Sequence, residues 1–192
     1  MDMNNHVILL ASKSPRRQEL MQLLDLKFEI PASIEVEETY PSSLPAEKVP
    51  EYLSQKKASA YLNTLKENEI LVTADTVVIL GSEILGKPHS EDDAIDMLKK
   101  LSGNTHKVVT GVTITSSAMQ KTFSAITEVD FDILSDEDIR HYVSHYRPLD
   151  KAGAYGIQEW IGAVGIKAIR GSFYNVMGLP VHRLYKELRA FN

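Results

Sequence analysis

The chain begins with an apolar run followed by residues at helical spacing. Val7 to Ala11 is continuously apolar, which predicts a buried strand. Ser12 to Pro15 then forms a polar break, after which Leu20, Leu23 and Leu24 recur on one helix face. This order predicts a strand, a tight loop and a helix that begins at the proline.

A second apolar run is broken by two polar residues. Ile70 to Ala74 predicts another buried strand, and Val77 to Leu80 continues the apolar pattern. Asp75 and Thr76 lie between the two runs, so the first strand is expected to end abruptly at Asp75. In α/β sheets, ligand-binding groups gather at the carboxyl ends of strands. The position therefore makes Asp75 a candidate functional residue.

The rest of the chain alternates in the same way between helical spacing and β-rich stretches. The pattern predicts a short strand at Phe28 and Ile30, a loop over 33–44, a helix from Pro45 to about 66–69, a helix from Ser90 to Gly103, a hairpin of 106–116 and 122–133, a helix from Ser135 to His145, strands with functional loops over 148–180, and a closing helix after Pro180. Such alternation predicts an α/β fold. Since no linker or internal repeat interrupts it, residues 1–192 are expected to form a single domain.

Composition narrows the functional classes. With 192 residues, of which 43% are apolar, the chain can bury a substantial core. Its net charge of -5 argues against nucleic acid as a partner, and the absence of cysteine excludes thiol chemistry and Cys-based zinc sites. No apolar run approaches the roughly 20 residues that span a bilayer, and Met1 to His6 lacks signal-peptide features. We therefore expect a cytoplasmic protein.

The segment from Ser12 to Arg17 is the first candidate site. Arg16 and Arg17 are unusual in the first turn of a helix, because a helix N-terminus carries partial positive charge. A phosphate bound by the terminal amides, the serine hydroxyls and a guanidinium would offset that charge. The alternative is that both arginines extend into solvent or pair with carboxylates such as Glu19. These residues alone leave both alternatives open.

Three further polar residues have both a functional and an ordinary interpretation. A carboxylate such as Asp75 is costly at a buried strand end unless it is hydrogen-bonded, bound to metal or chemically useful, but aspartate also commonly serves turns. Thr76 could donate its hydroxyl to a ligand or occupy a strand position. Lys87, between Gly86 and Pro88, could direct its ammonium at a phosphate or extend into solvent.

An acidic group in the expected loop could bind a metal ion. Glu35 and Glu37 would share a face of an extended segment, with Glu38 beside them. Mg²⁺ prefers one or two protein carboxylates together with phosphate oxygens and water. A solvated loop is the simpler explanation unless another carboxylate, such as Asp75, converges on the group.

The sequence motifs of common phosphate-binding loops and of helical zinc sites are absent or incomplete. The sequence contains neither G-x-x-x-x-G-K-[ST] nor G-x-G-x-x-G, so the common phosphate-binding loops do not explain its features. His141 and His145 have the spacing of a helical zinc pair but lack the accompanying glutamate, and we interpret them as surface residues.

Taken in order, six segments of the sequence resemble the Maf family of nucleotide pyrophosphatases. They are Leu9 to Arg17, Ala74 to Val78, Gly86 to Pro88, Leu101 to Gly103 with His106, Pro148 to Gln158, and Gly171 to Pro180. The resemblance implies an elongated, mixed, twisted sheet with flanking helices and two lobes around a central cleft, similar to the inosine-triphosphatase fold. It also implies hydrolysis between the α and β phosphates with Mg²⁺ or Mn²⁺, and often a homodimer.

The resemblance also implies roles for individual residues. Asp75 matches the family's proton acceptor, and Ala154 to Gln158 looks like the branch that acts on dTTP and UTP. Positions linked to substrate choice match Arg16, Thr76 and Gln158. Polar positions of the family's cleft match Ser12, Arg17, Glu38, Lys57 and Lys87.

These expectations combine into one hypothesis. Asp75 deprotonates the attacking water, and Glu38 with Asp75 places the divalent metal. The cations expected to bind the phosphates are Arg16, Arg17, Lys57 and Lys87. Gln158 offers both a donor and an acceptor to a pyrimidine edge. The alternatives are a pyrophosphatase specific for 7-methyl-GTP and a nucleotide-binding regulator of cell division.

Overall fold

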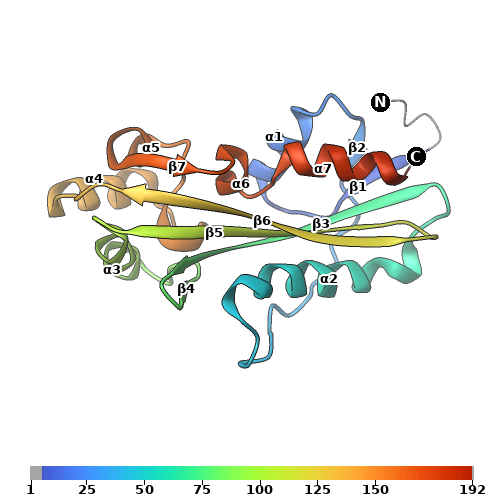
Figure 1. Ribbon diagram of the computed structural model, residues 1–192, viewed down its shortest axis with the longest axis horizontal. Helices are drawn as coiled ribbons and strands as arrows, with labels where there is room; N and C mark the ends of the chain where they lie inside the picture. Colours follow the sequence, from blue (N-terminus) through green and yellow to red (C-terminus); the bar gives the residue numbers. More distant parts are fainter. Residues whose placement is uncertain (1–5, 192) are drawn as a thin grey trace. The chain divides into compact units, whose positions relative to one another are not determined.

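The computed structural model describes residues 6–191 and shows a mixed α/β fold, as expected (Figure 1). Its seven-stranded sheet has the order β2-β1-β3-β5-β6-β7, with β4 paired to β3. The strands are β1 (Val7–Leu10), β2 (Phe28–Glu29), β3 (Glu69–Leu80), β4 (Glu83–Leu85), β5 (Thr105–Thr115), β6 (Gln120–Phe131) and β7 (Ile166–Arg170). Strands β1 and β3 are parallel, whereas β3 and β4 are antiparallel, so the sheet is mixed.

Helices flank the strands along the chain. The α-helices are α1 (Pro15–Gln22), α2 (Val49–Tyr61), α3 (Glu91–Leu101), α4 (Asp136–Tyr146), α5 (Trp160–Gly165), α6 (Phe173–Met177) and α7 (Val181–Leu188). Short 3-10 helices are η1 (Ala46–Lys48), η2 (Leu62–Thr64), η3 (Ala152–Ala154) and η4 (Arg189–Phe191). None of the helices within residues 6–191 is long and apolar enough to cross a membrane.

The chain divides into two compact units. Unit 1 comprises the described residues of Met1–Asp75, Thr110–Ala125 and Gly178–Asn192, and unit 2 comprises Thr76–Val109 and Ile126–Met177. The chain passes from one unit to the other within β3, β5 and β6, and again between Met177 and Gly178. That the whole chain acts as one domain stays a prediction, and residues 1–5 and 192 lie outside the described part.

The core of unit 1 forms around the parallel pair β1 and β3. Leu9 lies opposite Leu71 in this pair, and both pack with Ala58 of α2. The predicted helix after the loop is confirmed as α1, with Leu20 buried. Leu23, however, is the C-cap residue of this helix and is 62% exposed. The predicted apolar face of this helix is therefore buried at Leu20 but not at Leu23.

A glycine lets α2 approach the sheet closely. A Cβ atom at Gly111 of β5 would lie 2.2 Å from the carbonyl carbon of Pro50, in the first turn of α2. Atoms at that distance overlap, so any larger residue at this position would push the helix away. Gly111 thus sets how near the side chains of α2 can come to β3 and β5.

Unit 2 contains two helices whose beginnings follow from the sequence. The Ser90 hydroxyl accepts a hydrogen bond from the Asp93 amide at the start of α3, where a helix was predicted. Ser135 and Asp138 form a capping box at the start of α4. Both helices contribute to one apolar core, in which Leu98 of α3 is fully buried.

The structure contradicts three details of the predicted pattern. Asp75 is not at a strand end, because β3 runs unbroken from Glu69 to Leu80 and a polar residue can stay within a strand when its side chain finds a partner. The predicted helix after Pro45 ends at Tyr61 rather than near 66–69. Over 148–180 the expected strands reduce to β7, since most of this stretch is helical or turn.

We expect Gly111→Ala to lower the free energy of unfolding by about 2 to 3 kcal/mol, because the added methyl overlaps the main chain of Pro50. Urea unfolding followed by circular dichroism measures this change. Gly86→Ala is the matched control, because a Cβ atom there meets nothing within 4 Å. Equal free energies of unfolding for the two variants would show that α2 moves to accommodate the methyl group without loss of stability.

Candidate active site

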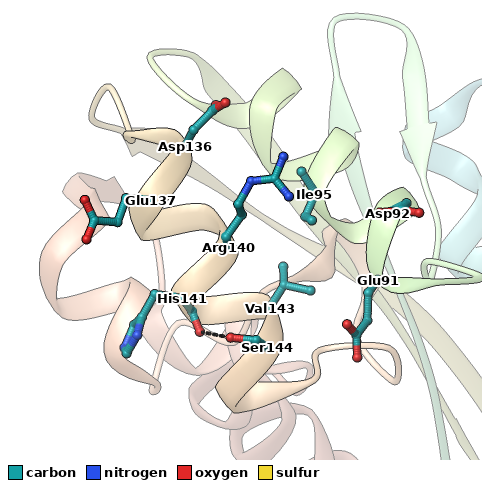
Figure 2. Close-up of a pocket in the computed structure, with 9 residues that line it drawn as sticks. All are labelled: Glu91, Asp92, Ile95, Asp136, Glu137, Arg140, His141, Val143 and Ser144. Carbon is teal, nitrogen blue, oxygen red and sulfur yellow. Dashed lines mark hydrogen bonds between the residues drawn. The ribbon is translucent and has the colours of Figure 1, made fainter.

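A hollow of about 690 Å³ lies between α3 and α4 in unit 2 (Figure 2). Its walls carry Glu91, Asp92, Asp136 and Glu137, which all stand in the first turns of the two helices. Carboxylates are favoured there by the helix dipole, so their presence needs no ligand. None of the candidate site residues lines this hollow, so it is separate from the site predicted around Asp75.

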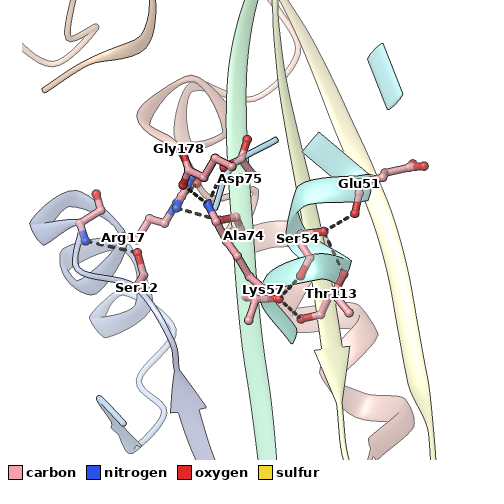
Figure 3. A network of polar contacts seen from close by, with 12 residues as sticks. Ser12, Arg17, Glu51, Ser54, Lys57, Ala74, Asp75, Thr113 and Gly178 are labelled. Atoms are coloured by element: carbon pink, nitrogen blue, oxygen red, sulfur yellow. Dashed lines mark hydrogen bonds and ion pairs between the residues drawn. The ribbon is translucent and has the colours of Figure 1, made fainter. Parts of the chain in front are cut away.

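Three charged side chains meet in unit 1 around Asp75. The Lys57 Nζ atom lies 2.6 Å from Asp75 Oδ1 and 2.7 Å from Glu38 Oε1. Figure 3 shows Lys57 reaching from α2 to Asp75 on β3. The Asp75 side chain is 10% exposed, whereas that of Glu38 is 54% exposed. The arrangement is a buried carboxylate connected through one ammonium to a carboxylate at the surface.

Burial and charge act on Asp75 in opposite directions. Burial raises the pKa of Asp75 above its ordinary value, and the nearby Lys57 and Arg17 cations oppose that rise. The negative charge of Glu38 adds to it. A carboxylate with a raised pKa is a stronger base than an exposed one, which suits proton transfer near neutral pH.

Buried hydroxyl groups fix the position of α2 against the strands. Ser54 lies three residues before Lys57 on the helix, and Thr73 lies two residues before Asp75 on β3, so each pair shares a face. The Thr73 hydroxyl donates to the Ser54 carbonyl oxygen at 2.7 Å. The hydroxyls of Ser54 and Thr113, which Figure 3 shows side by side, lie 2.9 Å apart. These bonds hold Lys57 at the level of Asp75.

These hydroxyl groups were not among the residues that the sequence singled out. Ser54, Thr73 and Thr113 are fully buried in the structure. The available signal was a serine on the same helix face as Lys57 and a threonine on the same strand face as Asp75. Small hydroxyl residues are common in both settings, so this signal has little specificity.

Arg17 connects the helix after β1 to two other segments of unit 1. Its Nε donates to the Gly178 carbonyl oxygen at 2.8 Å, and its Nη1 donates to the Ala74 carbonyl oxygen at 2.9 Å. Burial lowers the pKa of Arg17, and the Asp75 charge opposes this shift. Arg17 therefore holds the main chain beside Asp75, whatever it also contributes to a ligand.

The loop before α1 contains the segment predicted to bind phosphate. The Ser12 hydroxyl accepts from the Ser14 amide at 3.3 Å, and the Gln18 side chain donates to the Ser12 carbonyl oxygen at 3.1 Å. Ser14 occupies the N-cap position without a side-chain capping bond, and the first turn carries no acidic residue. Arg16, in that turn, is partly buried. Phosphate binding here stays a prediction.

The remaining candidates belong to unit 2. Thr76 follows Asp75 on β3 and is partly exposed. Lys87 is exposed two residues after the end of β4, and Gln158 is exposed at the end of a buried segment. The structure thus brings Glu38, Lys57 and Asp75 together within unit 1, and the ligand-binding roles of the others stay predictions.

Glu38 and Asp75 are the residues predicted to bind a divalent metal ion. Within residues 6–191 there is no group of three or more His, Cys, Asp or Glu side chains that could hold an ion. Glu38 and Asp75 do converge on one point, since both contact the Lys57 ammonium. Two carboxylates fit the preference of Mg²⁺, which takes its other ligands from phosphate and water. His141 and His145 are both exposed, as expected.

The chain is similar to known proteins over nearly its whole length. The family model described as "Maf-like protein" matches residues 7–191. A protein of Phocaeicola vulgatus named "dTTP/UTP pyrophosphatase" is 54% identical over 188 residues, which cover 98% of this chain and 97% of that protein. A protein of Bacteroides thetaiotaomicron with the same name is 50% identical over 188 residues, with coverage of 98% and 97%.

One solved structure aligns with nearly the whole chain. A HAM1 protein from Coxiella burnetii covers 96% of this chain and 99% of its own, with a TM-score of 0.49 and 15% identity. So low a score identifies no shared family by itself.

We expect Lys57→Met to raise the pKa of Asp75 further, because the variant removes the largest charge that opposes the effect of burial. Titration of the Asp75 carboxyl carbon by NMR measures the change. Lys56→Met is the matched control, since the Lys56 ammonium bonds to Thr39 instead. An unchanged or lower Asp75 pKa in Lys57→Met would contradict the assigned ion pair.

Proposed function

The chain belongs to the Maf family, and from this premise we propose that it hydrolyses dTTP and UTP to the nucleoside monophosphate and pyrophosphate. The names of its relatives support the substrates, and their identity extends over nearly the whole chain. The observation that carries the chemistry is the buried Asp75 carboxylate beside the Lys57 ammonium. A passive phosphate receptor would gain little from a buried negative charge.

In the proposed reaction, water attacks the α phosphorus while its proton passes to Asp75. A new bond forms between the water oxygen and phosphorus, and the bond to the bridging oxygen breaks as pyrophosphate leaves. Lys57 occupies Asp75 Oδ1, so we assign the proton to Oδ2. The raised pKa of Asp75, which results from burial, makes this carboxylate a better proton acceptor than an exposed one.

Cations are needed because the reacting triphosphate is strongly negative and negative charge develops on the leaving pyrophosphate. We assign phosphate binding to Ser12 and Arg16 at the start of α1, where amides, a hydroxyl and a guanidinium lie within one turn. Arg17 fixes the main chain beside Asp75 and adds positive charge there. The resemblance implies a further phosphate contact for Lys87 and links Arg16, Thr76 and Gln158 to substrate choice.

A divalent metal fits the two carboxylates of unit 1. Glu38 and Asp75 would hold Mg²⁺ or Mn²⁺, since their oxygens already converge on one cation, the Lys57 ammonium. When bound, the ion neutralises charge on the phosphates. Glu38 is exposed enough to shift toward an ion, whereas Asp75 is fixed by burial.

Two alternative functions would use parts of the same site. A pyrophosphatase for 7-methyl-GTP would keep Asp75 and Lys57 but read a different base. A nucleotide-binding regulator of cell division would bind nucleotide tightly without turnover. The cytoplasmic location and the homodimer also stay predictions.

A panel of nucleotides assayed for pyrophosphate release tests the function. We expect turnover of dTTP and UTP with Mg²⁺ or Mn²⁺ to exceed that of dGTP and 7-methyl-GTP, and EDTA to abolish it. Preferred turnover of 7-methyl-GTP would favour the first alternative. Nucleotide binding without turnover in either metal would favour the regulator.

Asp75→Asn keeps the shape of the side chain but removes the proton acceptor, so kcat for dTTP should fall by about 100-fold or more. Steady-state kinetics measures this, with circular dichroism to check the fold. Asp92→Asn, at an exposed position, is the matched control and should keep wild-type kcat. Wild-type turnover by folded Asp75→Asn would refute the assignment of the base.

Gln158→Ala removes a donor and an acceptor suited to uracil and thymine. The ratio of kcat/KM for dTTP to that for dGTP should fall by about 10-fold, the equivalent of one well-formed hydrogen bond. Gln22→Ala, also at an exposed glutamine, should leave the ratio unchanged. An unchanged ratio in Gln158→Ala would remove this residue from base recognition.

A further inference from the structure

The segment that ends at Gln158 is buried but almost without regular structure. Lys151 is 8% exposed, and Ala154 to Ile157 are buried, whereas Gln158 is exposed. Ala154 has a φ of 58°, in the left-handed region that non-glycine residues rarely adopt. Such a conformation costs about 1 kcal/mol or more and persists only when its surroundings enforce it. The surroundings of this segment therefore decide how Gln158 is presented.

One tyrosine contacts the chain on both sides of Gln158. The Tyr142 hydroxyl accepts a hydrogen bond from the Gly156 amide at 3.0 Å and donates one to Glu159 Oε2. Tyr142 belongs to α4 and is fully buried. A single hydroxyl thus connects the residue two before Gln158 with the residue directly after it.

The charge of Glu159 is balanced within the same unit. Lys151 Nζ lies 3.2 Å from Glu159 Oε1 and 2.8 Å from Asp150 Oδ1. Burial and the bond to Glu159 raise the pKa of Tyr142, so the phenol stays protonated and keeps its donor. The contact is also tight, since a Cβ atom on Gly156 would lie 2.8 Å from Glu159 Cδ.

Two more contacts fix the segment before it reaches Tyr142. The Tyr155 hydroxyl lies 2.7 Å from His106 Nε2, and the Gly153 amide donates to the Gly86 carbonyl oxygen at 3.0 Å. Gly86 directly precedes Lys87, another candidate site residue. The segment is thereby held at several points, of which the Tyr142 contact is nearest to Gln158.

We propose that Tyr142 is a positioning residue for nucleobase selection, because its hydroxyl joins the Gly156 amide to Glu159 and so fixes the main chain that carries Gln158. The inference rests on the proposed function through the role of Gln158. Tyr142 itself is buried and acts through Gln158 rather than on the substrate.

Tyr142→Phe removes the hydroxyl and keeps the ring, which stacks on Tyr146 with centroids 5.1 Å apart. The kcat/KM ratio of dTTP to dGTP should fall about 5- to 10-fold, mainly through KM for dTTP, with kcat within about 2-fold of wild type. Tyr146→Phe, on the same helix but 39% exposed, should leave the ratio unchanged. A uniform loss of kcat for all nucleotides would indicate a merely structural role and overturn the proposal.

A double-mutant cycle tests whether Tyr142 acts through Gln158. In the Gln158→Ala background, Tyr142→Phe should change the dTTP to dGTP ratio by less than about 2-fold, because the residue being positioned is gone. Additive effects of the two substitutions would overturn the proposal. Glu159→Gln, which keeps an acceptor oxygen for Tyr142, should retain more of the preference than Glu159→Ala.

Hydrogen exchange separates this proposal from the proposed function. Tyr142→Phe leaves the Gly156 amide without its acceptor, so exchange of that amide should accelerate about 10-fold in the nucleotide-free protein. Unchanged exchange would overturn the positioning role. If exchange accelerates but Gln158→Ala leaves the base preference intact, the assignment of Gln158 fails, and with it the effect of Tyr142 on selection.

Discussion

The ion pair between Lys57 and Asp75 is the contact on which the arrangement of unit 1 depends. A carboxylate in the middle of a buried strand is costly without a charged partner. The partner comes from α2, so the helix must lie close to β3. Gly111 permits this approach, and the buried hydroxyls of Ser54 and Thr73 set the level at which Lys57 meets Asp75.

This dependence explains which parts of the structure could be predicted from sequence. Apolar runs and capping residues act locally, so β1, α1 and the start of α3 follow from them. Asp75 was expected at a strand end because a charge interrupts an apolar pattern. Strand β3 continues through it because Lys57, 18 residues earlier, supplies the partner. A local pattern contains no information about such a distant contact.

The segment from Lys151 to Gln158 shows the same limit in unit 2. Its glycines and aromatic residues predicted strands with functional loops, but the left-handed Ala154 and the short helix η3 exclude a regular strand there. Its conformation depends on Tyr142 and His106, which come from other elements. Resemblance to a family pointed to Gln158, but only the structure shows what holds it.

The proton-acceptor role proposed for Asp75 places two opposing requirements on its carboxylate. A proton acceptor must be ionised before the reaction, yet a carboxylate that is fully stabilised by cations is a weak base. Burial raises the Asp75 pKa and makes the group more basic, while Lys57 and Arg17 keep the charged form accessible. The Lys57 ammonium forms ion pairs with both Asp75 and Glu38, so its charge is shared between two carboxylates. Lys57 and Arg17 therefore offset only part of the effect of burial, and the raised pKa of Asp75 fits the proton-acceptor role proposed for it.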